Sequence, residues 1–391
     1  MQGVIRLEKI KIVFLMQQLT CGGAEQALYD LICLMDKTKF DISVFVLVGD
    51  GVWEDKFKNA GISVVNVFYR RQKGCSPVKF VKHQLRKAGI HSVIHRDSRR
   101  LVGMFYPEGV DIVAAYSMWG DEAAALAYGA KHVKFIHGNV ANNKPFRELT
   151  LKTRDLLPEY QRIVCVSKES FQAFREIIGI EENVSLHYNP LNSENVCRMA
   201  QETVALPEDV PYLCAVGRLA PEKGYDRLIR IHKRILEQGV PHKLIIVGDG
   251  PEREKLEQTV QETDSSGSVI MTGFQSNPYP YMKNSRCLVC SSFTEGLPVI
   301  AMEALALGVP IVSAVPSIGE IFGDAACGLI TGNDDESLEA GIRKMLCDDA
   351  FYEKVKAGAR ERSVFFDGAK MVKELEEMFI ALKEENKNGC N

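Results

Sequence analysis

With 391 residues, the chain is too long for one ordinary hydrophobic core and suits two domains of about 200 residues each. Hydrophobic residues make up 46% of it and charged residues 25%, which is typical of a globular protein and excludes extensive disorder. The first apolar run, residues 10–16, is far shorter than the roughly 20 residues of a membrane-spanning helix, and no signal-type cleavage pattern follows it. We therefore expect a cytoplasmic protein.

The alternation of short apolar, β-branched runs with longer amphipathic segments predicts parallel sheets with helices on both faces. In the first half, we expect strands at residues 10–16, 41–48, 63–67, 111–116, 133–137 and 162–167, and helices at 25–35, 121–129 and 168–178. In the second half, we expect strands at 212–216, 243–247, 268–271, 286–290 and 310–313, and helices at 225–238, 338–345, 351–364 and 369–383. The polar segment HYNPLNSENV, residues 187–196, predicts a turn and a domain boundary between the halves.

Charge is unevenly divided although the net charge is only −3. Residues 1–190 hold 26 Lys and Arg against 20 Asp and Glu, and the remainder holds 22 against 31. From Arg70 to Arg100 there are ten basic residues, three histidines and one acid, Asp97. This stretch fits a face for anionic lipid or for a phosphate-bearing acceptor, and it fits a solvated helical surface equally well.

Cysteine usage points to reduced, packed thiols. There are eleven cysteines, and only Cys287 and Cys290 lie close together. No second pair and no nearby histidine cluster completes a zinc site.

Two features mark the carboxyl ends of the first-half strands, where open sheets bind ligands. Gly22 and Gly23, in the loop CGGAEQ after the first strand, allow backbone to approach a ligand closely, although turn chemistry also explains a glycine pair. His137 closes the run KFIH, so its ring should project from a strand end. A functional role for this histidine competes with a structural one.

The most informative stretch is SSFTEGLPVIAME, residues 291–303. It predicts a loop after a strand and then a helix that begins at or next to Pro298, whose unpaired N–H groups suit a phosphate. Glu295 and Glu303 flank that anion site, and carboxylates accept hydrogen bonds from a ribose diol or a sugar ring. We therefore expect a sugar-nucleotide site here.

Other second-half loops reach the same edge. In GRLAPEKG, residues 217–224, Arg218 and Lys223 are placed to neutralise a diphosphate without metal. GDGPERE, residues 248–254, is a glycine-rich turn without a dinucleotide fingerprint. Phe274, in TGF, borders a nucleobase or belongs to an ordinary turn.

Together these stretches resemble the family 4 (group 1) glycosyltransferases, a retaining group with the GT-B fold. The most specific part is the Glu-x7-Glu motif from Glu295 to Glu303, and it is supported by VGRLAPEKG and GGAE. The resemblance implies two Rossmann-like, doubly wound α/β domains facing across a cleft that closes over the donor. These would be an acceptor-side domain, residues 1–190, and a donor domain, residues 191–366, with a last helix at 367–386 packing back on the first domain.

The resemblance also implies roles for individual residues. Arg218 and Lys223 would bind the donor diphosphate, Glu303 the ribose, and Glu295 a hydroxyl of the transferred sugar. Gly22 and Gly23 would approach the donor, and His137 would lie near the transferred sugar. Backbone at three further positions would complete the donor site: Gly296, Leu297 and Pro298. The departing phosphate would take the acceptor proton on one face of the sugar, whereas Glu295 would be the nucleophile in a covalent alternative.

By the same resemblance, the function would be retaining transfer of a hexosyl-type sugar from a nucleotide sugar, with a UDP-sugar favoured, to a glycan or lipid-linked acceptor. We favour bacterial capsule, exopolysaccharide or envelope synthesis, with peripheral contact at the inner membrane face through the stretch from Arg70 to Arg100. Acceptor recognition would also use the loop at residues 117–120, which contains Trp119. No nucleic acid partner is expected. No cofactor or divalent metal is expected either, because no two aspartates stand two positions apart.

Three other readings stay open to different degrees. A sugar-nucleotide 2-epimerase shares the architecture and would convert its substrate without an acceptor. A non-catalytic partner that binds sugar nucleotides or a glycan is disfavoured, because the four charged residues of the motifs are all present: Arg218, Lys223, Glu295 and Glu303. A nicotinamide oxidoreductase is disfavoured because the turn after the first strand lacks the Rossmann glycine fingerprint.

Overall fold

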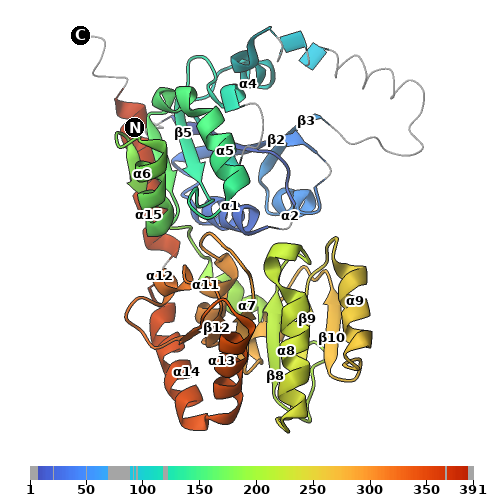
Figure 1. Ribbon diagram of the computed structural model, residues 1–391. Coiled ribbons are helices and arrows are strands. Elements are labelled where there is room, and N and C mark those ends of the chain that lie inside the picture. The colour runs from blue at the N-terminus through green and yellow to red at the C-terminus, as the bar shows by residue number, and fades with distance from the viewer. Residues whose placement is uncertain are drawn as a thin grey trace. The chain divides into compact units, whose positions relative to one another are not determined.

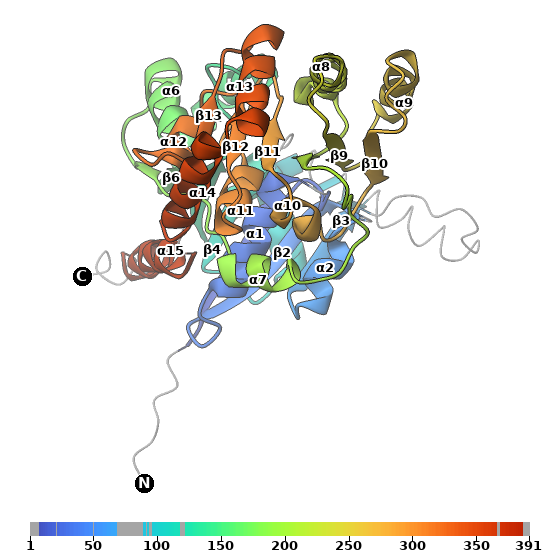
Figure 2. The same ribbon diagram turned by 90° about the horizontal axis from the view of Figure 1, so that it is seen from below.

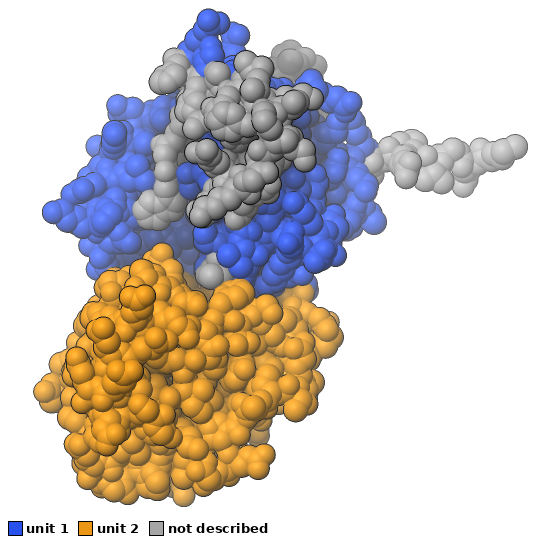
Figure 3. Space-filling model, turned by 90° about the vertical axis from the view of Figure 1, so that its right-hand side faces the viewer, with its two compact units in different colours: residues 1–189, 369–391 blue, residues 190–368 orange. Residues whose placement is uncertain are grey.

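The computed structural model describes residues 8–20, 22–49, 51–68, 89–90, 92–93, 96–117, 122–365 and 368–385. The chain divides into two compact units (Figure 3). Unit 1 consists of residues 1–189 and 369–391, coloured blue, and unit 2 of residues 190–368, coloured orange. Each unit has its own parallel sheet, so the α/β class expected from the sequence is confirmed.

Unit 1 is built on a seven-stranded parallel sheet with the order β3-β2-β1-β4-β5-β6-β7 (Figure 1). Its strands are β1 (Ile10–Met16), β2 (Phe40–Val48), β3 (Ser63–Phe68), β4 (Ile112–Ser117), β5 (Lys131–Ile136), β6 (Arg162–Cys165) and β7 (Val184–Leu186). Apolar residues follow one another along β1, and successive side chains point to opposite faces. The strand is therefore buried on both sides, as a central strand of a parallel sheet must be.

Helices cover both faces of this sheet. They are α1 (Gly23–Leu34), α2 (Glu54–Asn59), α4 (Leu101–Phe105), α5 (Lys144–Lys152), α6 (Lys168–Ile178) and α15 (Gly368–Glu384), with 3-10 turns η1 (Ser98–Arg100), η2 (Glu122–Ala125) and η3 (Arg154–Glu159). Buried residues of α1, α2 and α15 form one core with Ile12 and Phe14, and those of α4 and α6 form another with Val13 and Leu15.

The last helix, α15, completes the core of unit 1 although it follows unit 2 in sequence. Phe379 lies edge-to-face against Phe14, with ring centroids 6.1 Å apart, and against Phe40 at 6.4 Å. The backbone N–H of Asp36 donates to Glu376 Oε1 at 2.6 Å. These contacts bind α15 to β1, to β2 and to the loop between α1 and β2.

Unit 2 has a six-stranded parallel sheet with the order β10-β9-β8-β11-β12-β13. Its strands are β8 (Tyr212–Val216), β9 (Lys243–Val247), β10 (Val269–Gly273), β11 (Cys287–Cys290), β12 (Ile311–Ser313) and β13 (Gly328–Ile330). Its helices are α7 (Ser193–Met199), α8 (Tyr225–Glu237), α9 (Arg253–Glu262), α10 (Tyr279–Lys283), α11 (Val299–Ala306), α12 (Ile318–Phe322), α13 (Asp335–Cys347) and α14 (Asp349–Ser363), with the 3-10 turn η4 (Pro221–Lys223). Figure 2 shows α8, α9 and α13 on one face of the sheet and α7, α10 and α11 on the other.

The expected helix at residues 121–129 is wrong, because the described part of this segment holds only the short turn η2. Ala124 and Ala125 are fully buried, and η2 packs on α4 and β4, so tertiary packing overrides the high helix propensity of alanine. The polar segment at 187–196 is irregular only as far as Asn192, whose side chain accepts from the N–H of Asn195 and caps α7.

Two broader expectations concern thiols and membranes. The eight cysteines that the structure describes are all free thiols, and five of them are buried. Among the described helices, none combines the length and the apolar character that crossing a membrane requires.

Candidate active site

The candidate site of unit 2 lies where the strand order reverses. Strands β8 and β11 are neighbours, but the chain continues from β8 to β9 on one side and from β11 to β12 on the other. Loops that leave such neighbouring strands diverge, and the carboxyl edge between them is where open parallel sheets bind ligands. The loop at residues 217–224 follows β8, and the loop at residues 291–298 follows β11.

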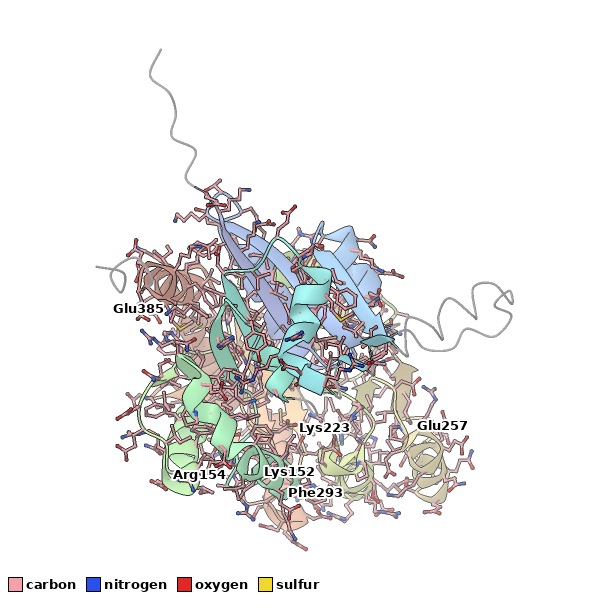
Figure 4. The ribbon with its side chains drawn as sticks, turned by 90° about the horizontal axis from the view of Figure 1, so that it is seen from above. Lys152, Arg154, Lys223, Glu257, Phe293 and Glu385 are labelled. Atoms are coloured by element: carbon pink, nitrogen blue, oxygen red, sulfur yellow. The ribbon has the colours of Figure 1, made fainter. Side chains whose placement is uncertain are left out.

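Close backbone contact joins these two loops. Ser291 Oγ donates to the carbonyl of Lys223 at 2.8 Å, and the N–H of Phe293 donates to the carbonyl of Glu222 at 2.8 Å. Gly224 has φ +62°, and a Cβ at this position would lie 2.4 Å from the carbonyl oxygen of Ser291. A glycine is therefore required here, both for its conformation and for the approach of the second loop. Figure 4 labels Lys223 and Phe293, one from each loop.

Lys223 and Glu295 are brought together by this junction. Lys223 Nζ lies 2.5 Å from Glu295 Oε1, and Ser292 Oγ donates to the same oxygen at 2.6 Å. The two charged side chains are 23% and 18% exposed. Among the described residues, the second carboxylate oxygen of Glu295 has no hydrogen-bond partner. One oxygen is thus held in place, while the other remains available to accept from a ligand hydroxyl.

Arg218 is not in contact with that pair. Its guanidinium is 61% exposed and donates to Glu222 Oε1 at 2.7 Å. Within the described residues, no hydrogen bond or ion pair connects Arg218 with Lys223, Glu295 or Glu303. An exposed ion pair of this kind contributes little to stability, so the arginine can exchange its partner for an anion at small cost.

Glu303 is buried, at 5% exposure, in the second turn of α11. Its Oε1 accepts from Tyr279 Oη at 2.8 Å. Pro298 is the N-cap of this helix and its own side chain makes no capping hydrogen bond, so the first N–H groups are suited to an anion. Gly296 and Leu297 precede the cap directly, and Leu297 is buried. The expected helix start next to Pro298 is confirmed.

Tyr279 was not among the sequence-predicted site residues. It lies in α10 and is 4% exposed. A buried tyrosine needs a partner for its hydroxyl, but sequence alone does not identify Glu303 as that partner. Phe274, in contrast, follows the edge strand β10 and is 41% exposed.

In unit 1, the glycine pair forms the start of α1 at the carboxyl end of β1. Gly22 is the extended N-cap and Gly23 is the first helical residue. The carboxylate of Glu25 folds back over the cap. It lies so close that a Cβ on Gly22 would be 2.5 Å from Glu25 Oε2. Glu25 Oε1 also accepts from Thr20 Oγ1 at 2.6 Å. The glycine at position 22 therefore makes room for an acidic side chain of its own helix.

His137 directly follows β5, as expected from the sequence. Its ring packs on Tyr116, with centroids 4.5 Å apart, and stacks on Phe135 at 6.2 Å. Burial lowers the pKa of His137 to about 4, although a hydrogen bond with the backbone of Tyr116 opposes the shift. The ring is therefore neutral at neutral pH, and its buried Nε2 has no hydrogen-bond partner among the described residues.

The basic stretch is described only in part. Arg70 and Arg71 lie outside the described residues, as does Trp119. Arg99 donates to Glu159 at 2.7 Å, and Arg100 lies 3.5 Å from Asp97. These last two arginines are already paired with acids.

Comparison with known families matches both halves of the chain. The family model described as Glycosyl transferases group 1 matches residues 199–362, and the model described as Glycosyltransferase Family 4 matches residues 21–195. Together the two matches take in most of the chain. The protein therefore belongs to the family 4 (group 1) glycosyltransferases, as the sequence motifs predicted.

Curated relatives share part of the chain. Over 223 residues it is 30% identical to the N-acetylgalactosamine-N,N'-diacetylbacillosaminyl-diphospho-undecaprenol 4-alpha-N-acetylgalactosaminyltransferase of Campylobacter jejuni. The aligned region covers 56% of this chain and 60% of that protein. Over 203 residues it is 28% identical to the lipopolysaccharide core biosynthesis glycosyltransferase LpsD of Rhizobium meliloti, covering 51% of this chain and 58% of that protein. The chain thus spans less than two thirds of the length of these relatives.

Solved structures match nearly the whole chain. Anabaena Alr3699/HepE in complex with UDP and glucose has a TM-score of 0.72 at 18% identity, covering 95% of this chain and 100% of that one. Sucrose-phosphate synthase from Thermosynechococcus elongatus has a TM-score of 0.75 at 16% identity, covering 96% and 99%. At such identities the likeness establishes the fold alone, and the expected GT-B fold is confirmed.

Proposed function

We propose that the protein is a glycosyltransferase that moves a hexosyl-type sugar from a nucleotide-sugar donor, preferably a UDP-sugar, to a glycan or lipid-linked acceptor. The observation that carries this proposal is the Lys223–Glu295 pair at the reversal point of the unit 2 sheet, with Ser292 on the same carboxylate oxygen. Family membership supports it, as do the names of two relatives, one of which includes diphospho-undecaprenol and the other lipopolysaccharide core biosynthesis.

The proposed mechanism of transfer depends on stabilising the negative charge that develops on the leaving group. Departure of a nucleoside diphosphate builds negative charge on its distal phosphate, which Lys223 and the uncapped start of α11 are suited to stabilise. Arg218 adds a second cation once it releases Glu222. Because Lys223 and the start of α11 are fixed by the fold before the reaction, these two groups need little reorganisation when the bond breaks.

Glu295 is proposed to hold a hydroxyl of the transferred sugar. Two donors, Lys223 and Ser292, already occupy its Oε1, which suits an oriented hydrogen-bond acceptor better than a nucleophile free to approach the anomeric carbon. We therefore favour retention in which the departing phosphate takes the acceptor proton on one face. The covalent route through Glu295 is the alternative.

The remaining donor contacts are assigned by the same reasoning. Glu303 is proposed to bind the ribose, because its carboxylate is oriented by Tyr279 close to the helix start. In unit 1, His137 is proposed to hydrogen-bond the transferred sugar, because its neutral ring offers an unpaired Nε2. No divalent metal is proposed to take part, since Lys223 and Arg218 supply the positive charge.

The decisive experiment combines binding and turnover. A panel of nucleotide sugars is tested by thermal shift, and a true donor at about 100 times its dissociation constant should stabilise the native state by about 2.7 kcal/mol. Release of nucleoside diphosphate is then followed with and without candidate lipid-linked acceptors. Release that depends on an acceptor supports a transferase. Conversion of the donor sugar without an acceptor identifies an epimerase instead, and donor binding without turnover identifies a non-catalytic partner.

We further propose that the protein acts at the inner face of a membrane, in the synthesis of a capsule, exopolysaccharide or envelope polysaccharide. The support is the basic composition from Arg70 to Arg100 and the diphospho-undecaprenol in the name of one relative. Surface charge of this sign attracts anionic headgroups.

A further inference from the structure

Arg227 is a buried cation for which the proposed chemistry has no use. It lies in the first turn of α8 and is 7% exposed. Its Nε donates to the carbonyl of Ser291 at 2.9 Å, and one terminal nitrogen donates to the same carbonyl at 2.6 Å and to that of Ser292 at 3.2 Å. A single side chain therefore holds two successive carbonyls of the loop that leads to Glu295.

Asn333, in the loop before α13, extends this hold. Arg227 donates to the carbonyl of Asn333 at 3.1 Å and to its Oδ1 at 2.8 Å. Asn333 Nδ2 in turn donates to the carbonyl of Phe293 at 2.8 Å. The ring of Phe293 lies over the guanidinium, 4.2 Å from Cζ to the centroid. Three consecutive residues of the loop are thus bound by Arg227 and Asn333.

The position of this cation is costly unless its donors are satisfied, since a buried charge loses its hydration. Here the guanidinium donates to carbonyl oxygens and is also attracted by the negative charges of Asp335 and Asp334 at the start of α13. Its planar fork of donors fixes those carbonyls in direction as well as in distance. An apolar side chain would fill the same volume without orienting the loop.

The loop is held on its other side by the turn that carries Lys223. Ser291 and Phe293 each bond to that turn, as described above. Residues 291–293 are therefore fixed between η4 and the Arg227–Asn333 pair. Ser292 belongs to this fixed segment, and Glu295 follows two residues after its end.

From this arrangement we infer that Arg227, together with Asn333, is a positioning residue for the proposed transfer reaction: it sets the loop that presents Ser292 and Glu295 to Lys223. The inference rests on the proposed function for its catalytic consequence. Arg227 itself binds neither donor nor acceptor in this account.

The first test measures the loop without any substrate. Full-length wild-type protein is compared with Arg227→Lys, which keeps charge and length but loses the fork, and with Asn333→Ala, a milder change at an exposed position. Arg230→Lys is the matched control, because Arg230 lies on the same helix and, within the residues that the structure describes, forms surface ion pairs with Asp226 and Glu262. Amide hydrogen exchange of residues 291–298 should become faster in both test variants and remain unchanged in the control. Unchanged exchange in both test variants would overturn the inference.

The second test measures coupling to the chemistry. Arg227→Lys should lower kcat roughly 10- to 100-fold, the scale expected for misplaced reacting groups, with the donor KM within about 3-fold. In a Glu295→Gln background, the same change should have an effect of less than about 3-fold, because residues that act through one another are not additive. Additive losses would show that Arg227 does not act through Glu295. If the wild type transfers no sugar from any donor, the proposed function fails, while the exchange measurement still decides whether Arg227 positions the loop.

Discussion

The hydroxyl of Tyr279 donates a 2.8 Å hydrogen bond to the carboxylate of Glu303, and this bond joins α10 to α11 through two residues that are 24 positions apart in sequence. Both side chains are buried, so the hydroxyl fixes one carboxylate oxygen in direction. The arrangement connects a residue that sequence motifs single out with one that they do not.

Glu303→Ala should weaken UDP binding, because the proposed ribose contact is lost. Tyr279→Phe should weaken it less, by about 3- to 10-fold, since the carboxylate remains and loses only the hydrogen bond that orients it. Calorimetric titration with UDP measures both. Tyr212→Phe is the matched control, because Tyr212 is a buried tyrosine of the same unit whose hydroxyl bonds a backbone carbonyl. Equal affinity in Glu303→Ala would show that the ribose lies elsewhere.

Lys223→Ala should mainly slow transfer, with kcat reduced about 100- to 1,000-fold, the cost of removing one donor to a developing oxyanion. The loss arises because Lys223 contacts the proposed leaving group and also orients Glu295. Steady-state kinetics with a fixed donor and acceptor give the value. Lys255→Ala serves as control, since Lys255 lies on α9 and its ion pair within the described part of the chain is with Glu252 on the surface. A variant with unaltered kcat would remove Lys223 from the mechanism.

A chelator should leave transfer undiminished, because the proposed charge stabilisation comes from Lys223, Arg218 and a helix start. Activity is measured after dialysis against EDTA, and again after addition of magnesium or manganese. Complete loss that either metal restores would refute this expectation and would call for a metal-bridged diphosphate.

Stability should fall as the pH drops below about 6.5, in part through His232 and His242. These two buried rings bond to each other at 2.8 Å, and His232 also bonds Ser268. Burial, with smaller repulsion from His242 and Lys233, lowers the pKa of His232 to about 3. Burial also lowers the pKa of His242, against a backbone hydrogen bond that opposes the shift.

The sign follows from proton binding. Below pH 6.5 the two histidines bind protons in the unfolded chain but stay neutral in the folded protein. The free energy of unfolding therefore decreases as the pH falls, by about 2 kcal/mol at pH 5 for His232 alone. Urea unfolding at pH 7.5 and 5.0 measures the difference. A variant with both histidines replaced by glutamine should lose less stability between these pH values, and an identical loss would contradict the assignment. Titration of the His232 ring by NMR in the wild type gives an independent check.

Membrane binding should depend more on Arg70 and Arg71 than on Arg99 and Arg100. Each cation near an anionic surface contributes about 1 kcal/mol, but Arg99 and Arg100 already lie beside Glu159 and Asp97. Cosedimentation with anionic liposomes at low salt compares two double variants, one with Arg70 and Arg71 changed to glutamine and one with Arg99 and Arg100 changed to glutamine. A wild-type protein that ignores such liposomes would remove the membrane contact from the proposal.

The order of strands and loops was predictable, because the spacing of apolar residues identifies the strands and the glycine-rich or polar segments between them identify the loops. The strands β1, β8 and β9 were predicted with their observed bounds, since each is a predominantly apolar run that ends in a polar or glycine-rich loop. The placement of residues 217–224 and 291–298 at one sheet edge followed from parallel topology. Short elements such as β7 and β13, with three residues each, give too little pattern to be recognised.

Pairings inside the site were not predictable, because they depend on which loops fold against each other. The sequence indicated that Lys223 and Glu295 share an edge, but it did not distinguish a direct ion pair from two separate ligand contacts. It placed Arg218 with Lys223, whereas the structure pairs Arg218 with Glu222. Arg227 carried no signal at all, since a basic residue on an amphipathic helix is normally a surface residue.

The position of α15 has a consequence for how the chain is synthesised. Residues 369–385 are the last described part to leave the ribosome, yet Phe379 and Leu382 belong to the core of unit 1. Unit 2 can therefore complete its fold while unit 1 still exposes the apolar surface that this helix covers. A fragment that stops at residue 189 carries the whole seven-stranded sheet but should aggregate, and adding the last helix as a separate peptide should restore its solubility.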